Sequence, residues 1–212
     1  MTKFTKIEAI QYKVSIFLKM LIALLIVISA IRQEFFLVIT SMIVLLLSFS
    51  PTIVSRSYKI RLPIEVDFMV TILLYLHYVL GEYNHFYIKF SWWDLFLHGG
   101  NSIILGLVGF IMAYGLLLTS KMQAKPFFIS LFSLTFAVFI GVLWEIFEFG
   151  MDYFFGFTMQ KSGLVDTMTD LMMDVVGAMV VSILGFFYLK KKKLGIFDRI
   201  IKRFVEYKYN DD

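Results

Sequence analysis

Long runs of apolar residues make up most of the chain, and short polar segments separate them. A helix needs about 20 residues to cross the roughly 30 Å hydrocarbon layer of a bilayer. Six segments meet this requirement, at residues 14–31, 35–55, 64–82, 93–118, 127–149 and 168–189. The pattern predicts an all-α fold, a polytopic membrane helical bundle with six transmembrane helices. We expect residues 1–189 to form a single transmembrane helical domain.

The first apolar run contains one lysine, Lys19, near its predicted start. A lysine at that depth is expected to extend its side chain toward the interface. The run is also long enough to be a signal peptide. The stretch "VISAIRQ" at its end offers no convincing small-x-small cleavage site, so an uncleaved span is the favoured interpretation.

Composition agrees with a membrane protein. Hydrophobic residues make up 59% of the 212, charged residues only 17%, and the mean hydropathy is +0.81. A soluble domain carries about a quarter charged residues, and no polar segment here is long enough to build a separate soluble core. The sequence contains no cysteine, which excludes disulfides, zinc–thiolate sites and cysteine nucleophiles.

The distribution of lysine and arginine predicts the orientation. With the N-terminus inside, the inner segments and the tail at 190–212 hold sixteen of these residues, while the outer loops hold three: Arg32, Lys89 and Lys161. Cytoplasmic segments carry such an excess, so both termini are expected to be cytoplasmic. The basic tail predicts a short amphipathic C-terminal helix on the inner leaflet. We favour this over nucleic-acid binding and expect no nucleic-acid partner.

Acidic and histidine residues gather where the outer ends of spans three to six are predicted. Side chains one or two helical turns apart share a helix face, and most of these residues follow that spacing. We therefore expect four helices to bring them to one level near the outer interface. The residues are His77 and Glu82; Asp94 and His98; Glu145, Glu148 and Asp152; and Asp166, Asp170 and Asp174.

Carboxylates gathered in this way repel one another and are costly to desolvate. Protonation, a bound cation or a hydrated pocket would each resolve the conflict. Carboxylates with histidine form a set of donors suited to Zn, Mn, Fe, Mg or Ca, and helix bundles build metal sites in this way. The expected metal ligands are Asp94, His98, Glu145, Glu148, Asp166 and Asp170, with Glu148 and Asp174 as catalytic candidates.

Several of these residues have simpler explanations. Asp166 and Asp170 fit helix caps or first-turn acids, and Glu148 and Asp152 fit a solvated helix end. His77 is expected to be a hydrogen-bonded interior histidine rather than a ligand. At the inner end of span three, Glu65 and Asp67 are expected to pair with nearby basic residues, Arg56, Lys59 or Arg61.

Four stretches together resemble a family of bacterial inner-membrane proteins, the YjdF-like domain of unknown function. They are "LHYVLGEYNHFY", "WWDLFLHGGNSIILGLVGF", "GVLWEIFEFGMD" and "MQKSGLVDTMTDLMMDVVGA". The family's Asp–x3–His, Glu–x2–Glu and Asp–Thr–x2–Asp positions correspond to Asp94 and His98, Glu145 and Glu148, and Asp166, Thr167 and Asp170. The last helix is more distantly similar to VanZ-like membrane proteins. The resemblance implies a multi-pass protein of the bacterial cytoplasmic membrane and supplies no activity.

Three classes of function remain open. One is a metal-dependent enzyme acting on lipid headgroups or other envelope substrates at the outer interface. Another is a cation or proton transporter, although transporters usually place their site near the midplane. The third is a structural or partner-binding membrane protein in which the acids form a polar lock without catalysis.

Overall fold

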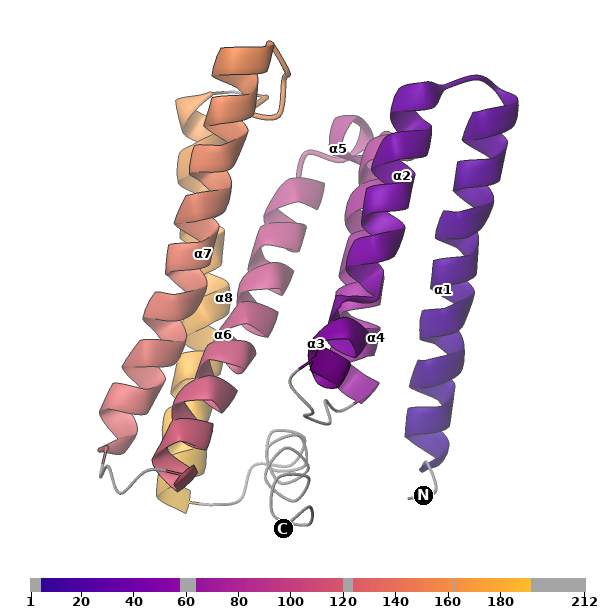
Figure 1. Ribbon diagram of the computed structural model, residues 1–212. Coiled ribbons are helices and arrows are strands. Elements are labelled where there is room, and N and C mark those ends of the chain that lie inside the picture. The colour runs from indigo at the N-terminus through magenta and orange to yellow at the C-terminus, as the bar shows by residue number, and fades with distance from the viewer. Residues whose placement is uncertain (1–4, 58–63, 120–123, 162, 192–212) are drawn as a thin grey trace. The chain divides into compact units, whose positions relative to one another are not determined.

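A computed structural model describes residues 5–57, 64–119, 124–161 and 163–191, and all regular elements among them are helices (Figure 1). These residues divide into two compact units, one ending at Phe90 and the other beginning at Ser91. Residues 192–212, which include most of the predicted amphipathic helix, lie outside the described residues.

Five helical segments are long and apolar enough to cross a membrane: Lys6–Ile31, Ile64–Tyr83, Trp93–Leu117, Pro126–Phe155 and Leu164–Lys190. A sixth span exists if α2 (Phe35–Ser48) and α3 (Ser50–Ser57), bent by 45° at their junction, are taken as one. The all-α, multi-pass fold predicted from hydropathy is therefore confirmed.

The bend between α2 and α3 has a local cause. Pro51 lies in the first turn of α3. Proline has no N–H to donate, and its ring clashes with the carbonyl four residues earlier. A helix running through this position must therefore kink or break, and the apolar run predicted as one straight span becomes a bent pair.

The first unit consists of α1 (Lys6–Ile31), α2, α3, α4 (Ile64–Leu74), the π-helix η1 (Tyr75–Tyr83) and the short α5 (Phe86–Lys89). A capping box between Thr5 and Glu8 starts α1 eight residues before the predicted span. The core of the unit joins α1, α2 and η1 through Ile22, Leu25, Val44, Tyr78 and Val79.

Lys19 lies in the middle of α1, where it is buried against α4 rather than extended to the interface. Its ammonium is 2.7 Å from the Asp67 carboxylate, and Ser15 and Thr71 complete the polar cluster. The expectation for Lys19 was wrong, because Lys19 is only 8% exposed. Asp67 pairs with Lys19, a partner that the sequence did not predict. Lys59 and Arg61, two of its expected partners, lie outside the described residues. The earlier start of α1 explains the difference, because it places Lys19 beside α4 and far from the helix end.

His77 belongs to the π-helix η1 and forms a hydrogen bond with the hydroxyl of Tyr87 on α5. The rings of His77 and Tyr87 also meet edge to face, with their centroids 5.6 Å apart. The expected hydrogen bond of His77 is confirmed, and the side chain is half-buried. Glu82 lies on the same element. Both residues therefore belong to the first unit, and the candidate site described below is built from residues of the second unit.

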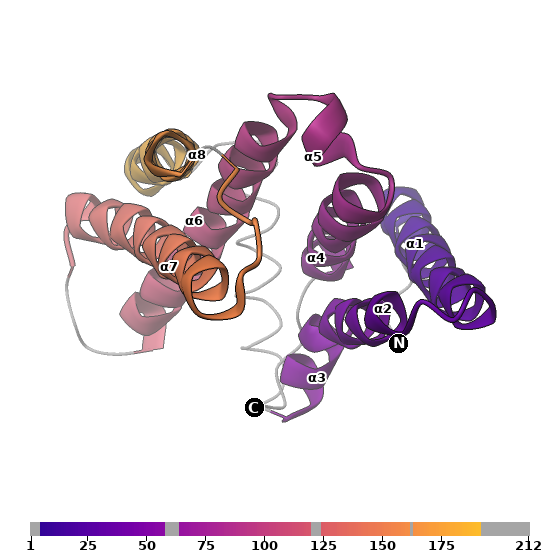
Figure 2. The ribbon, with the colours of Figure 1, turned by 90° about the horizontal axis from the view of Figure 1, so that it is seen from above.

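The second unit packs α6 (Trp93–Thr119), α7 (Pro126–Phe155) and α8 (Leu164–Lys191) against one another in all three pairs (Figure 2). Glycine permits a close approach between α6 and α8. A Cβ atom on Gly177 would overlap the carbonyl oxygen of Gly99 and lie 3.1 Å from the Cβ of Ser102. Small residues allow membrane helices to pack this closely, and here they bring polar side chains of α6 and α8 within hydrogen-bonding range.

Candidate metal centre at one end of the three-helix unit

The acidic residues of the second unit gather where α6 and α8 begin and α7 ends, a region we call the carboxylate end. Asp94 and His98 lie one turn apart on α6, with His98 Nε2 3.8 Å from Asp94 Oδ1. Asp170, on the facing side of α8, is only 2% exposed. One ligand atom each from Asp94, His98 and Asp170 lies within 4.8 Å of the others. Their separation is short enough for one cation to contact all three.

Asp174 lies one turn further along α8 and contacts the other nitrogen of the His98 ring, Nδ1. Its Oδ1 is 3.3 Å from His98 Nδ1 and accepts a hydrogen bond of 2.7 Å from the hydroxyl of Ser102. A proton on Nδ1, donated to this carboxylate, leaves Nε2 as the lone-pair nitrogen. Metal-binding histidines are usually oriented in this way by a carboxylate behind the ring. This geometry suits a positioning role for Asp174.

Glu145, on α7, completes the surroundings of His98. Its Oε1 is 3.7 Å from His98 Nε2, and the residue is 4% exposed. Both carboxylate oxygens are buried, and neither has a hydrogen-bond partner within the usual distance and angle limits among the described residues, although the Thr167 hydroxyl is close enough to interact with the carboxylate. A buried carboxylate without partners is costly, and a cation at Nε2 would remove much of that cost.

Glu148 lies one turn beyond Glu145 on α7. It is buried, and the indole Nε1 of Trp144 donates a hydrogen bond of 2.9 Å to its Oε1. Its neighbour Asp152 is not simply solvated: the backbone amides of Met159 and Gln160 donate to its two oxygens at 2.7 and 2.8 Å. Asp152 therefore fixes the connection that follows α7.

This connection turns back over the carboxylate end. Gly156 and Gly163, at its two ends, have positive φ angles of 70° and 61°, which glycine adopts without strain. Asp166 Oδ2 accepts a hydrogen bond of 3.0 Å from the backbone N–H of Lys161. The Lys161 ammonium in turn lies 3.7 Å from Asp94 Oδ2. A basic side chain therefore reaches the site from the loop.

Gly141 on α7 makes room for Asp174. A Cβ at this position would overlap Asp174 Oδ2 and lie 2.8 Å from its Cγ. The Oδ2 atom is buried and has no hydrogen-bond partner among the described residues. The close approach of α7 to α8 therefore encloses the carboxylate that orients His98.

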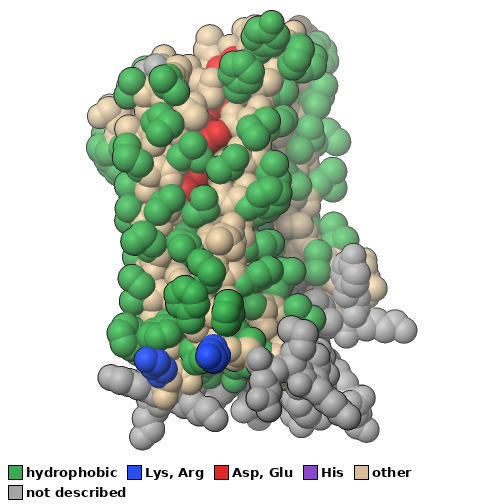
Figure 3. All heavy atoms as spheres, turned by 90° about the vertical axis from the view of Figure 1, so that its left-hand side faces the viewer, with side chains coloured by type: hydrophobic (Ala, Val, Ile, Leu, Met, Phe, Trp, Pro, Cys, Tyr) green, Lys and Arg blue, Asp and Glu red, His purple; other side chains and the backbone are tan. Residues whose placement is uncertain are grey.

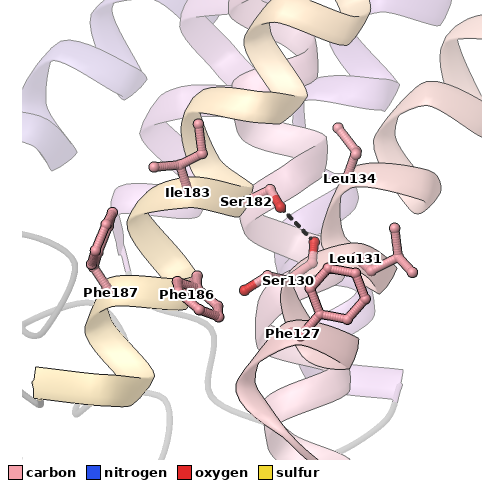
Figure 4. A pocket seen from close by; sticks show the side chains of 8 residues that line it. All are labelled: Phe127, Ser130, Leu131, Leu134, Ser182, Ile183, Phe186 and Phe187. Atoms are coloured by element: carbon pink, nitrogen blue, oxygen red, sulfur yellow. Dashed lines mark hydrogen bonds between the residues drawn. The ribbon is translucent and has the colours of Figure 1, made fainter.

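A hollow of about 380 Å³ lies between α7 and α8 at the opposite end of the unit (Figure 4). Its lining is apolar except for two serines, and Ser182 donates a hydrogen bond of 2.8 Å to the carbonyl of Ser130. It contains no acid or histidine, so it is separate from the candidate metal centre. The lining residues are Phe127, Ser130, Leu131, Leu134, Ser182, Ile183, Phe186 and Phe187.

Of the predicted metal ligands, the structure brings Asp94, His98 and Asp170 together and places Glu145 beside them. Glu148 is engaged by Trp144, and Asp166 supports the loop. Sequence reasoning missed two participants. Lys161 was counted only as an outer-loop charge. Gly141 gave no chemical signal, although its spacing of four from Glu145 places it on the same helix face.

Comparison with known proteins agrees with a membrane protein containing these helices. A family described as "Predicted membrane protein (DUF2238)" matches residues 14–191. The chain belongs to this family. The match covers all three helices of the carboxylate end and most of the first unit, and the YjdF-like resemblance is to this same family. An uncharacterized protein of Thermotoga maritima is 30% identical over 182 residues, covering 84% of this chain and 91% of its own length. No solved structure matches the chain.

Proposed function

We propose that this member of the DUF2238 family binds a divalent metal ion at its carboxylate end and uses it in hydrolytic chemistry on lipid or envelope substrates. Asp94, His98 and Asp170 supply the ligands, and Glu145 is close enough to join them. The observation that carries the proposal is the arrangement around His98. Asp174 contacts Nδ1 of the His98 ring. The other nitrogen, Nε2, faces Asp94 and Glu145, and both buried oxygens of Glu145 lack a hydrogen-bond partner among the described residues.

The mixture of ligands suits several divalent ions. Imidazole suits Zn and Fe, whereas carboxylates suit Mn, Mg and Ca. A single histidine among several carboxylates is compatible with any of these, and Mn²⁺ is a practical probe for all-oxygen and mixed sites. A bound ion would polarise a substrate oxygen and activate water for attack.

The protein's own groups have distinct tasks in this proposal. Asp174, held by Ser102, orients His98. Glu148 is the candidate general base: it would accept a proton from the attacking water and pass the same proton to the leaving group as the bond to that group breaks. Its hydrogen bond from Trp144 fixes the carboxylate direction. The carboxylate end is predicted to be the outer one, which places this chemistry at the depth of lipid headgroups.

Metal binding to the purified full-length protein in nanodiscs tests the proposal. Metal content is measured by mass spectrometry, and Mn²⁺ affinity by electron paramagnetic resonance after chelation. Asp170→Asn and His98→Ala are expected to weaken Mn²⁺ binding by more than the roughly 10–100-fold seen for outer-shell changes. Glu34→Gln, in the first unit, is the matched control and should bind Mn²⁺ like the wild type.

A protein that contains no metal and binds no Mn²⁺ would refute the metal centre. Bound metal with no hydrolysis of envelope lipids, together with cation flux in sealed vesicles, would favour transport. If Asp170→Asn and Glu145→Gln alter only unfolding or assembly, the acids form a polar lock. Circular dichroism of each variant separates loss of metal from loss of fold.

A further inference from the structure

Lys161 is the basic residue of the carboxylate end. Between residues 91 and 191 the sequence contains no arginine, and its other lysines, at 121, 125, 190 and 191, flank the opposite ends of α6, α7 and α8. The ammonium of Lys161 lies 3.7 Å from Asp94 Oδ2, and its side chain is 39% exposed. It therefore reaches a candidate metal ligand while remaining accessible from outside the unit.

Four hydrogen bonds to side chains hold the loop that carries Lys161. Asp152 accepts from the two amides that precede Lys161, and Asp166 accepts from the amide of Lys161 itself. The side chain of Gln160 donates a further bond of 2.7 Å to the hydroxyl of Thr167. These contacts anchor the loop to both α7 and α8, so the base of the lysine side chain has a defined position over the site.

The two oxygens of Asp94 face different groups. Oδ1 lies toward His98 Nε2, at 3.8 Å, and Oδ2 lies toward Lys161. A divalent ion bound by Asp94 and His98 would repel the nearby ammonium and compete with it for the same carboxylate. The exposed, flexible lysine side chain can turn from Asp94 to an anion held at the ion. An ion and an ammonium side by side form a clamp suited to the oxygens of a phosphoryl group.

We propose that Lys161 binds the anionic phosphoester of the substrate beside the metal ion. This inference rests on the proposed metal centre and adds the substrate class. A lipid headgroup is the favoured source. Figure 3 shows acidic side chains in a line between hydrophobic ones on the face formed by α7 and α8, in the half away from the blue basic side chains. A headgroup could therefore approach the acids from the bilayer as well as from solvent.

The test uses the full-length protein in phosphatidylcholine nanodiscs loaded with Mn²⁺. Phosphate binding is followed by paramagnetic broadening of the ³¹P resonance, with inorganic phosphate in one arm and phosphatidic acid in the other. Lys161→Gln is expected to weaken phosphate binding at least about tenfold while Mn²⁺ affinity stays equal or increases. Lys161→Arg should retain binding within about threefold, because the charge and a hydrogen-bond donor remain. Lys125→Gln, a lysine at the other end of α7, is the matched control.

The outcomes are distinguishable. If the wild type binds no Mn²⁺, the metal centre and this inference fail together. If Mn²⁺ binds but phosphate does not, or Lys161→Gln leaves phosphate affinity unchanged, the inference fails and the metal centre stands. Binding in the phosphatidic acid arm supports a lipid substrate, whereas binding of inorganic phosphate alone supports the same clamp acting on a water-soluble phosphoester.

Discussion

Replacing Gly177 by alanine should push α6 and α8 apart. The added Cβ would overlap the carbonyl oxygen of Gly99 and lie 3.1 Å from the Cβ of Ser102. Most of this obstruction is backbone, which no side-chain rotation can relieve. Overpacking of a close-packed interior typically costs about 1–3 kcal/mol. The alanine also gains about 1 kcal/mol in helix propensity, so the overpacking term must be measured against a suitable control.

Gly150→Ala provides that control. Gly150 is also helical, and a Cβ there would meet nothing within 4 Å. The difference in unfolding free energy between the two variants therefore isolates the packing term, which we expect to be about 1–3 kcal/mol against Gly177→Ala. Unfolding in mixed micelles of increasing SDS content, followed by circular dichroism, measures it. Equal stability of the two variants would refute the close approach of α6 and α8.

Three further predictions concern individual contacts. Lys19→Met should destabilise the protein by about 3 kcal/mol, the low end for breaking a buried pair, because the half-buried Asp67 loses its ammonium partner but keeps the hydrogen bond from Ser15; Asp67→Asn in the same chain should recover part of this in SDS unfolding. Asp174→Asn should lower Mn²⁺ affinity about 10–100-fold without loss of helix content, because His98 loses its orienting carboxylate; unchanged affinity would exclude the positioning role. Asp152→Ala removes the acceptor for two loop amides, each worth about 1–3 kcal/mol, so trypsin should cleave after Lys161 at least tenfold faster than in wild type, and equal cleavage rates would show that the loop is held by other contacts.

Hydropathy predicted the helices well because a lipid environment leaves few alternatives. Backbone groups in hydrocarbon must be satisfied within the segment, so a long apolar run becomes a helix. The boundaries were less accurate. Helix α1 begins at Lys6 and α7 continues to Phe155, because capping by Thr5 and Gly156 sets these ends rather than the limits of the apolar runs.

Part of the candidate site could be predicted from the periodicity of the helix. Helical periodicity places Asp94 beside His98 and Asp170 beside Asp174, whichever way the helices pack. It does not show which face meets which neighbour. The pairing of Lys19 with Asp67, and that of Lys161 with Asp94, join residues 48 and 67 positions apart in the chain. Such contacts depend on tertiary packing, which single-sequence patterns do not contain.

The depth of the carboxylate stripe on α8 has an electrical consequence. Asp174 lies four residues beyond Asp170, about 6 Å at 1.5 Å per residue, which is roughly a fifth of the hydrocarbon thickness. With the carboxylate end outward and the hydrocarbon boundary taken at Asp170, a divalent ion bound at His98 lies no deeper than Asp174 and crosses at most a similar fraction of the transmembrane voltage. One charge crossing the whole membrane is worth about 2.3 kcal/mol per 100 mV, so at 100 mV the ion would gain at most about 0.9 kcal/mol, or about fivefold in affinity. An energised membrane would therefore load this site more fully than a depolarised one.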